Sequence, residues 1–321
     1  MPRPIHYWHY WHYWLALGAL ALTLVLGLRF VSPPVLAQPP SNPRAITAYQ
    51  DFTEWYLNKY NLEQLPFRAA ALFDAASNTP LYYHQETTVM PTASLIKMVT
   101  AGTVLARNPN WYTPLSFTAD DNENLLRPYV GKADKFSLLK LEENENITLE
   151  QAFASMLVGS ANNAAVSLGR AIGLERSGFI SAMRQTAMSW GMTQTTVDEP
   201  SGLSLANTST AHDMALAACR VYRDFVASFY GSSPSVSFVT GNGNKKTVQH
   251  TVHELRNNPG HFFGAKTGYL TETQYHVAAG LITPQGHRLC VAVLTSPSRT
   301  ESEHALNALR LWADEMYQWG Q

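Results

Sequence analysis

The chain has 321 residues, a formal net charge of -1, and charged side chains at only 15% of its positions. This near-neutral balance, without a basic run, argues against nucleic acid as a partner. The hydrophobic fraction of 45% fits a folded chain with room for one large domain or two small ones, and excludes a mainly disordered one.

The amino-terminal segment differs in kind from the rest. Residues 15–28 are apolar and uncharged, as in the hydrophobic region of a secretory signal, and residues 35–37 (Val-Leu-Ala) suit a cleavage site. Counted over residues 14–31, the segment approaches the length of a membrane span, interrupted only by Arg29. We therefore expect export, with residues 1–37 either cleaved as a signal peptide or retained as an anchor in the cytoplasmic membrane.

Residues 38–67 are expected to form a linker, Pro-rich at first and then a short amphipathic helix over 46–60. The folded domain is expected to occupy residues 68–321. It begins with two predicted strands around a turn at 77–80, followed by a predicted helix over 94–106.

The middle of the domain is predicted to be mostly helical. After an acidic, Asn-rich stretch at 119–146, expected to be loop and exposed surface, helical spacing of apolar residues recurs at 149–158, 161–173, 177–190 and 210–227. Strands are predicted over 235–240, 245–252, 262–268, 275–283 and 288–296, and a closing helix over 300–318. This order predicts an α+β fold whose antiparallel sheet is built from both chain ends and covered by helices.

Two cysteines occur, Cys219 in a helical segment and Cys290 in a strand-like one. In an exported protein they could form a disulfide. Both lie among apolar residues that suit buried thiols, so the sequence favours two free thiols.

Three short motifs follow one another along the chain. Ser94-Leu-Ile-Lys97 begins a helix, Ser160-Ala-Asn162 lies in a turn between two helices, and Lys266-Thr-Gly268 ends a strand. Each motif alone is a weak signal, but their order and structural settings together are specific. The Ser-x-x-Lys spacing recurs at Ser137 and Lys140 in charged surroundings, where we expect it to be inert.

The residue types of these motifs suit nucleophilic catalysis. A serine hydroxyl needs an adjacent base, and Lys97 lies one helical turn from Ser94. Burial and a second cation at Lys266 would favour the neutral, basic form of Lys97. Ser160 would pass a proton to the leaving amine, and Asn162 would position Lys97 and the substrate amide.

The negative charge that develops on the substrate carbonyl also needs partners. The start of the helix at Ser94 supplies a favourable dipole. The backbone amides of Ser94 and Tyr269 would hold the oxyanion.

With these residues in view, the chain resembles the serine D-Ala-D-Ala carboxypeptidases, the low-molecular-weight penicillin-binding proteins, over about residues 68–318. Residues 70–100 look like the family's hairpin and nucleophile helix, and residues 199–218 like its Ser-Gly-Leu segment and following helix. The resemblance implies a β-lactamase/transpeptidase-like serine hydrolase fold, with an antiparallel sheet flanked by helices and a mostly helical second lobe.

The resemblance also implies an activity. The chain would be a D-alanyl-D-alanine carboxypeptidase that acts on peptidoglycan stem peptides, in the periplasm or another extracytoplasmic space, with β-lactams as covalent inhibitors. No metal or organic cofactor is implied. The implied catalytic residues are Ser94, Lys97, Ser160 and Asn162, and the implied substrate-binding residues are Lys266 and Thr267, which would bind the terminal carboxylate, with Gly268 and Tyr269.

Other functions remain open. One is a D,D-endopeptidase or a serine β-lactamase of the same fold, and the other is a non-catalytic cell-wall-binding module. Glu199 lies in the interval where class A β-lactamases have a glutamate, but its context, "DEPSGLSLAN", looks like the carboxypeptidase pattern. The departures from the family's pattern include Asn163, where aspartate is frequent, and His212, where arginine is frequent. Leu270 also replaces a frequent threonine, and the segment 248–258 differs from the strand that commonly precedes Lys-Thr-Gly.

Overall fold

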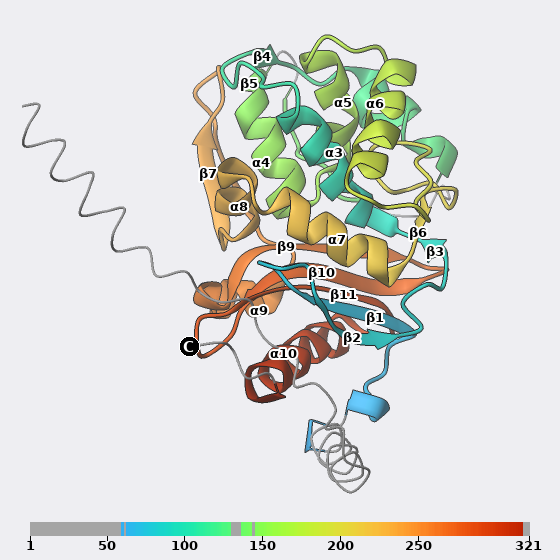
Figure 1. Ribbon diagram of the computed structural model, residues 1–321. Coiled ribbons are helices and arrows are strands. Elements are labelled where there is room, and N and C mark those ends of the chain that lie inside the picture. The colour runs from blue at the N-terminus through green and yellow to red at the C-terminus, as the bar shows by residue number, and fades with distance from the viewer. Residues whose placement is uncertain (1–58, 61, 130–135, 143–144, 317–321) are drawn as a thin grey trace, which may run out of the picture.

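The centre of the computed structural model, which describes residues 59–60, 62–129, 136–142 and 145–316, is a five-stranded antiparallel sheet. Its strand order is β2-β1-β11-β10-β9 (Figure 1). Ala69 pairs with Leu294, so the sheet is built from both ends of the domain, as the sequence predicted. The strands are β1 (Ala69–Asp74), β2 (Pro80–His84), β9 (Phe262–Leu270), β10 (Gln274–Ile282) and β11 (Arg288–Ser296).

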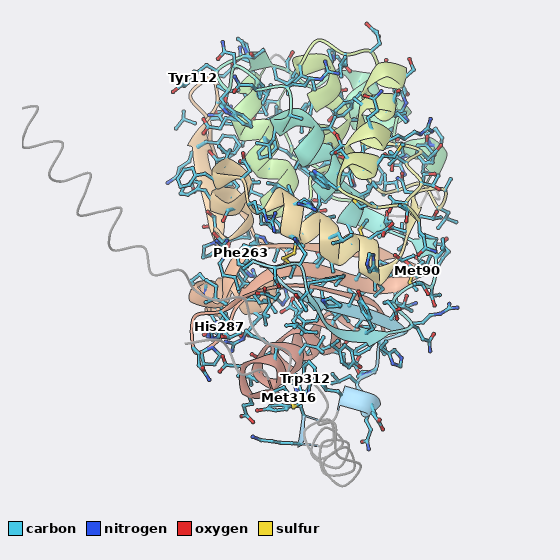
Figure 2. The ribbon with its side chains drawn as sticks, in the orientation of Figure 1. Met90, Tyr112, Phe263, His287, Trp312 and Met316 are labelled. Carbon is cyan, nitrogen blue, oxygen red and sulfur yellow. A yellow bond between two sulfur atoms is a disulfide. The ribbon has the colours of Figure 1, made fainter. Side chains whose placement is uncertain are left out.

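Both faces of this sheet are buried, which explains the apolar sequences of its inner strands. Successive residues of β1 belong to different cores, Ala71 to one and Leu72 to the other. Helix α7 (Ala211–Val221) packs on the first face and α10 (Arg299–Met316) on the second (Figure 1). Figure 2 shows Trp312 of α10 below the sheet, where it is buried.

A helical lobe lies on the far side of α7 (Figure 1). It contains the helices next to the first two sequence motifs, those of Ser94 and Ser160. These and the other helices of the lobe are α3 (Lys97–Leu105), α4 (Leu149–Gly159), α5 (Asn162–Ala171), α6 (Arg176–Ser189) and α8 (Phe225–Gly231).

The sequence prediction of one helix over 210–227 was wrong. The chain leaves the helical conformation after Val221, and Asp224 begins α8 as a capping residue. Its side chain accepts hydrogen bonds from the backbone amides of Val226 and Ala227, which satisfies donors that a continuous helix would have paired internally.

Strands β7 (Ser235–Val239) and β8 (Lys245–Gln249) form a separate two-stranded sheet beside the helical lobe. The strand predicted to extend to residue 252 therefore ends early, and α9 (His253–Asn257) begins soon after it. Two further pairs of strands are only two residues long. The region predicted as loop over 119–146 contains two helical turns. These elements are β3 (Met90–Pro91) with β6 (Thr208–Ser209), β4 (Pro114–Leu115) with β5 (Ile147–Thr148), η3 (Asp120–Asn124) and η4 (Arg127–Tyr129).

The expected free thiols are instead a disulfide between Cys219 of α7 and Cys290 of β11. Because α7 packs across β11, the two residues face each other with their Cα atoms 5.3 Å apart, within the range that a disulfide spans. Apolar surroundings did not distinguish the two states, since a buried disulfide is as apolar as a buried thiol.

The predicted signal or anchor at 1–37 lies outside the described residues, as does nearly all of the helix predicted over 46–60. No helix in the part of the chain that the structure describes is long and apolar enough to span a membrane. Leu62 and Leu65, which precede the predicted domain start at residue 68, are buried in the core beneath the sheet. The proposed domain boundaries stay a prediction.

Candidate active site

The three sequence motifs meet around one cavity of about 190 Å³. Ser94 comes from the 3₁₀ turn η2 (Ala93–Ile96) that precedes α3, Ser160 and Asn162 come from the turn between α4 and α5, and Thr267–Tyr269 come from β9. Lys97 and Lys266 are fully buried behind these residues. The structure thus brings together all eight residues that the sequence singled out. The cavity is also lined by Phe136, Ser137, Leu203, Thr251, Tyr275 and Arg299.

Lys97 connects two of the motifs. Its Nζ donates hydrogen bonds to Ser94 Oγ at 2.8 Å, to Asn162 Oδ1 at 2.6 Å, and to the backbone carbonyl of Ser201. Burial lowers the pKa of Lys97 from 10.5 to about 7, although the negative charge of Glu199 opposes this shift. Near neutral pH a substantial share of Lys97 is therefore an uncharged amine, which can accept a proton from the adjacent hydroxyl.

Ser160 lies beside the second buried lysine. It ends α4 in the left-handed conformation, with φ of 60°, which is uncommon for a residue other than glycine or asparagine. Lys266 Nζ donates to Ser160 Oγ at 2.8 Å and to the backbone carbonyl of Thr267 at 2.8 Å. Burial, together with the positive charges of Lys97 and Arg299, lowers the pKa of Lys266 well below its usual value.

Two glycines let other segments approach the backbone of Ser94 closely. A Cβ atom on Gly268 would lie 3.2 Å from the Ser94 nitrogen, so β9 passes directly beside that amide. Gly202 has φ of +86°, and a Cβ atom there would lie 2.0 Å from the carbonyl oxygen of Ala93. Side chains at either position would push these segments away from the site.

Glu199 organises the loop that faces Lys97. Its buried carboxylate accepts hydrogen bonds from the backbone amides of Ser201 at 2.6 Å and Leu203 at 2.8 Å, and from Asn207 Nδ2 at 2.8 Å. These contacts hold the loop so that the Ser201 carbonyl reaches Lys97. Glu199 itself does not line the cavity.

His212 does not take the place of the family's arginine. It lies at the start of α7, where its ring packs against Phe73 with the centroids 5.3 Å apart, and it does not line the cavity. The arginine that does line the cavity is Arg299, the first residue of α10. Its Nη1 lies 2.8 Å from His253 Nε2, while its buried Nε has no hydrogen-bond partner among the described residues.

Asn163, where the family frequently has aspartate, makes two hydrogen bonds that an aspartate could not make together. Its Oδ1 accepts from the backbone amide of Leu139 at 3.1 Å, and its Nδ2 donates to the carbonyl of the same residue at 2.9 Å. An aspartate carboxylate could only accept. The asparagine therefore fixes residues 137–140 against α5.

Ser137 lies closer to the site than the sequence indicated. It lines the cavity, although it had been expected on acidic exposed surface. Its hydroxyl donates to the carbonyl of Gly159 at 2.7 Å and, among the described residues, makes no hydrogen bond with Lys140.

Within the described ranges, no three His, Cys, Asp or Glu side chains gather where they could hold a metal ion.

Solved structures with the same architecture identify the fold. The Streptomyces K15 DD-transpeptidase matches with a TM-score of 0.71 at 21% identity, covering 78% of this chain and 97% of its own. A D-alanyl-D-alanine carboxypeptidase from Mycobacterium tuberculosis H37Rv matches with a TM-score of 0.67 at 21% identity, over 78% of this chain and 91% of its own. The predicted transpeptidase-like serine hydrolase fold is confirmed.

The particular family follows from the sequence. The model of the peptidase S11 family, D-alanyl-D-alanine carboxypeptidase, matches residues 59–298, and the chain belongs to this family.

Curated relatives carry two different names. A D-alanyl-D-alanine endopeptidase of Haemophilus influenzae is 28% identical over 207 residues, which cover 64% of this chain and 67% of the relative. The D-alanyl-D-alanine carboxypeptidase DacF of Bacillus subtilis is 23% identical over 241 residues, 74% of this chain and 59% of the relative. The chain thus spans about two thirds or less of the length of these relatives.

Proposed function

We propose that the chain is a serine-type D-alanyl-D-alanine carboxypeptidase that trims peptidoglycan stem peptides through an acyl-Ser94 intermediate. The observation that carries this proposal is the 2.8 Å contact between Ser94 Oγ and buried Lys97, whose pKa is lowered to about 7. Membership of the peptidase S11 family supports the same reaction.

Acylation would begin from the neutral form of Lys97, in which the Ser94 hydroxyl donates its hydrogen bond to the amine. Ser94 Oγ attacks the carbonyl carbon of the penultimate D-Ala, and its proton passes to Lys97. The C–N bond to the terminal D-Ala then breaks. Ser160 gives its proton to the leaving nitrogen, and the proton that Lys97 took from Ser94 passes to Ser160 through the hydrogen-bonded groups of the site, so Lys97 becomes neutral again. Water then attacks the ester and gives a proton to Lys97. Lys97 returns this proton to Ser94 Oγ as the ester bond breaks, which restores the Ser94 hydroxyl and releases the acid.

The substrate carboxylate would bind at the positive side of the cavity. Thr267 and Arg299 line the cavity there, and Lys266 is buried directly behind them. Arg299 supplies a positive charge that the sequence had not indicated. The close passage of β9 beside the Ser94 amide supports an oxyanion site formed by the amides of Ser94 and Tyr269.

Two measurements test this function. Mass spectrometry after penicillin treatment should find one penicilloyl adduct on the peptide that contains Ser94, and a stem pentapeptide should lose its terminal D-Ala. An enzyme that acquires the adduct but releases no D-Ala from any stem peptide would contradict the carboxypeptidase assignment. Failure to acquire the adduct at all would favour the non-catalytic module.

Of the alternatives, the endopeptidase has the better support, because the Haemophilus influenzae relative bears that name. The β-lactamase reading would need Glu199 as the base for deacylation, whereas its oxygens are engaged by the amides of its own loop.

We also infer that the chain acts outside the cytoplasmic membrane, where peptidoglycan lies. Residues 1–37 as a cleaved signal or retained anchor stay a prediction. Amino-terminal sequencing of mature protein should begin near Gln38 or find the intact segment in the membrane fraction, and full-length protein mainly in the cytoplasm would contradict export.

A further inference from the structure

A second cavity, of about 430 Å³, adjoins the proposed active site and shares Ser137 with it. Each wall is one continuous stretch of chain. Residues 137–140 form one wall, and residues 245–249, the whole of β8, form the other. Gly159 and Ala161, the two neighbours of Ser160, also line it. We refer to this cavity as the β8 groove.

One wall of the groove offers an open strand edge to an extended peptide, and the other wall is fixed in place. Among the described strands, β8 pairs only with β7, and no residue of β7 lines the groove, so the open edge of β8 faces it. The opposite wall is held from behind, because the Asn162 amide donates to the Ser137 carbonyl at 2.8 Å and Asn163 binds both backbone groups of Leu139. An open strand edge is a surface to which extended peptides add through main-chain hydrogen bonds.

The charge of the groove selects an acidic peptide. Lys140 and Lys245 are exposed, one on each wall, and no acidic side chain within the described residues forms an ion pair with either. The third lysine of the lining, Lys246, is neutralised by Glu145 at 2.9 Å. Two positive charges therefore remain available to a ligand.

The position of the groove relates it to the leaving group. Ser160, which would protonate the leaving nitrogen, lines the active-site cavity, whereas the residues on either side of it line the groove. A single departing D-Ala would not need a further binding surface. In a cross-linked substrate, however, the leaving amine belongs to a second stem peptide, and stem peptides bear free carboxylates along their length.

We propose that the β8 groove, through Lys140 and Lys245, binds the second stem peptide when the substrate is a cross-linked pair, and so determines how well the enzyme cleaves cross-links relative to unlinked stems. This inference rests on the proposed acyl-Ser94 function and on its endopeptidase alternative. The bond that breaks joins the D-Ala carbonyl to the side-chain amine of the second stem, and the amine leaves with the proton from Ser160. The acyl group passes to water as in the carboxypeptidase reaction.

The test compares two substrates. In the variant Lys140→Glu/Lys245→Glu, kcat/KM is measured for cleavage of a cross-linked tetrapeptide dimer and for D-Ala release from an unlinked pentapeptide. We expect the ratio of dimer to pentapeptide rates to fall about tenfold, because each substitution replaces an attraction by a repulsion. Arg107→Glu reverses one exposed charge outside both cavities and should preserve the ratio.

An unchanged ratio in the double variant would overturn the proposal while leaving the carboxypeptidase function intact. Binding of both peptides to Ser94→Ala protein, measured by calorimetry, separates the two proposals. If wild-type protein cleaves neither substrate, but the double substitution still weakens dimer binding about tenfold without affecting the pentapeptide, the groove assignment holds and the catalytic one fails. Equal binding of the dimer with and without the substitutions would refute the groove.

Discussion

The chain contains the spacing Ser-x-x-Lys twice, and the two copies differ in conformation. Ser94 and Lys97 lie on a helical turn, where three residues bring side chains to one face and Lys97 reaches the hydroxyl at 2.8 Å. Ser137 and Lys140 lie outside any helix or strand, in the segment that forms one wall of the β8 groove. Without a helical turn, residues three apart are not brought to one face, and among the described residues the Ser137 hydroxyl bonds to Gly159 and not to Lys140.

Burial separates the two pairs further. Lys97 is completely inaccessible and has three hydrogen-bond acceptors, whereas Lys140 is exposed to water. Desolvation makes the amine of Lys97 a base near neutral pH, and this change is what turns the first pair into a catalytic device. The comparison teaches that spacing alone does not define the motif, because the helix and the buried environment supply its chemistry.

The largest expected effect distinguishes the two serines. Ser94→Ala should abolish labelling by a fluorescent penicillin, because Ser94 is the cavity hydroxyl that pairs with Lys97 and lies beside the proposed oxyanion site. Ser137→Ala should still be labelled, since its hydroxyl contacts only the Gly159 carbonyl. Gel fluorescence of the purified variants measures both, and the reverse pattern would refute the assignment of the nucleophile.

The two lysines should differ almost as strongly. Lys97→Ala removes the general base and should slow acylation by penicillin about 10²- to 10⁴-fold. Lys140→Ala should remain within about twofold of wild type, because penicillin lacks the second peptide that the groove would hold. Stopped-flow measurement of the acylation rate compares them, and equal losses in both variants would show that burial of the lysine is not the decisive difference.

The pH dependence of acylation should report the protonation state of Lys97. Only the neutral amine accepts the Ser94 proton, so the rate should rise with pH below the pKa of about 7 and level off above it. Well below this pKa, each pH unit should change the rate about tenfold. A profile that is flat from about pH 5 to pH 8 would exclude Lys97 as the base.

The smallest effect on the chemistry is expected at Glu199, which shapes the surroundings of the first pair. Glu199→Gln places an amide where backbone N–H groups converge, so it should lower the free energy of unfolding by about 1–3 kcal/mol. The penicilloyl-Ser94 ester should nevertheless persist for minutes or longer in both proteins. Thermal unfolding and adduct mass spectrometry measure these quantities, with exposed Glu142→Gln as the control.

Rapid penicillin turnover by the wild type that disappears in Glu199→Gln would contradict this expectation. It would show that Glu199 activates water and that the protein is a β-lactamase.

Much of the candidate site could be predicted because its signals are local. The Ser94–Lys97 contact follows from helical spacing, and Ser160 and Asn162 are held by a short turn between two helices whose periodicity is visible in the sequence. An antiparallel sheet assembled from both chain ends followed from the order of the predicted elements, but the position of β9 at its edge and the approach of Gly268 to the Ser94 amide did not.

The features that the sequence did not reveal depend on contacts between distant segments. Arg299 stands at the start of the last helix with no motif around it, and only the packing of α10 on the sheet brings it to the cavity. The pairing of Cys219 with Cys290 likewise depends on the register of α7 over β11. The break before Asp224 was missed because apolar residues continue through it at helical spacing.

The strand order also determines when the protein can fold during its synthesis. β11, the last strand of the described chain, lies in the middle of the sheet, between β1 and β10. Residue 69 must therefore wait for residue 294 before it finds its partner, and the core face of α7 stays uncovered for the same period. Closing so long a segment is slow compared with local helix formation. A nascent chain from which β11 (Arg288–Ser296) has not yet emerged lacks the central strand of the sheet. It therefore stays unfolded during its synthesis, as passage through a translocation pore for unfolded polypeptides would require.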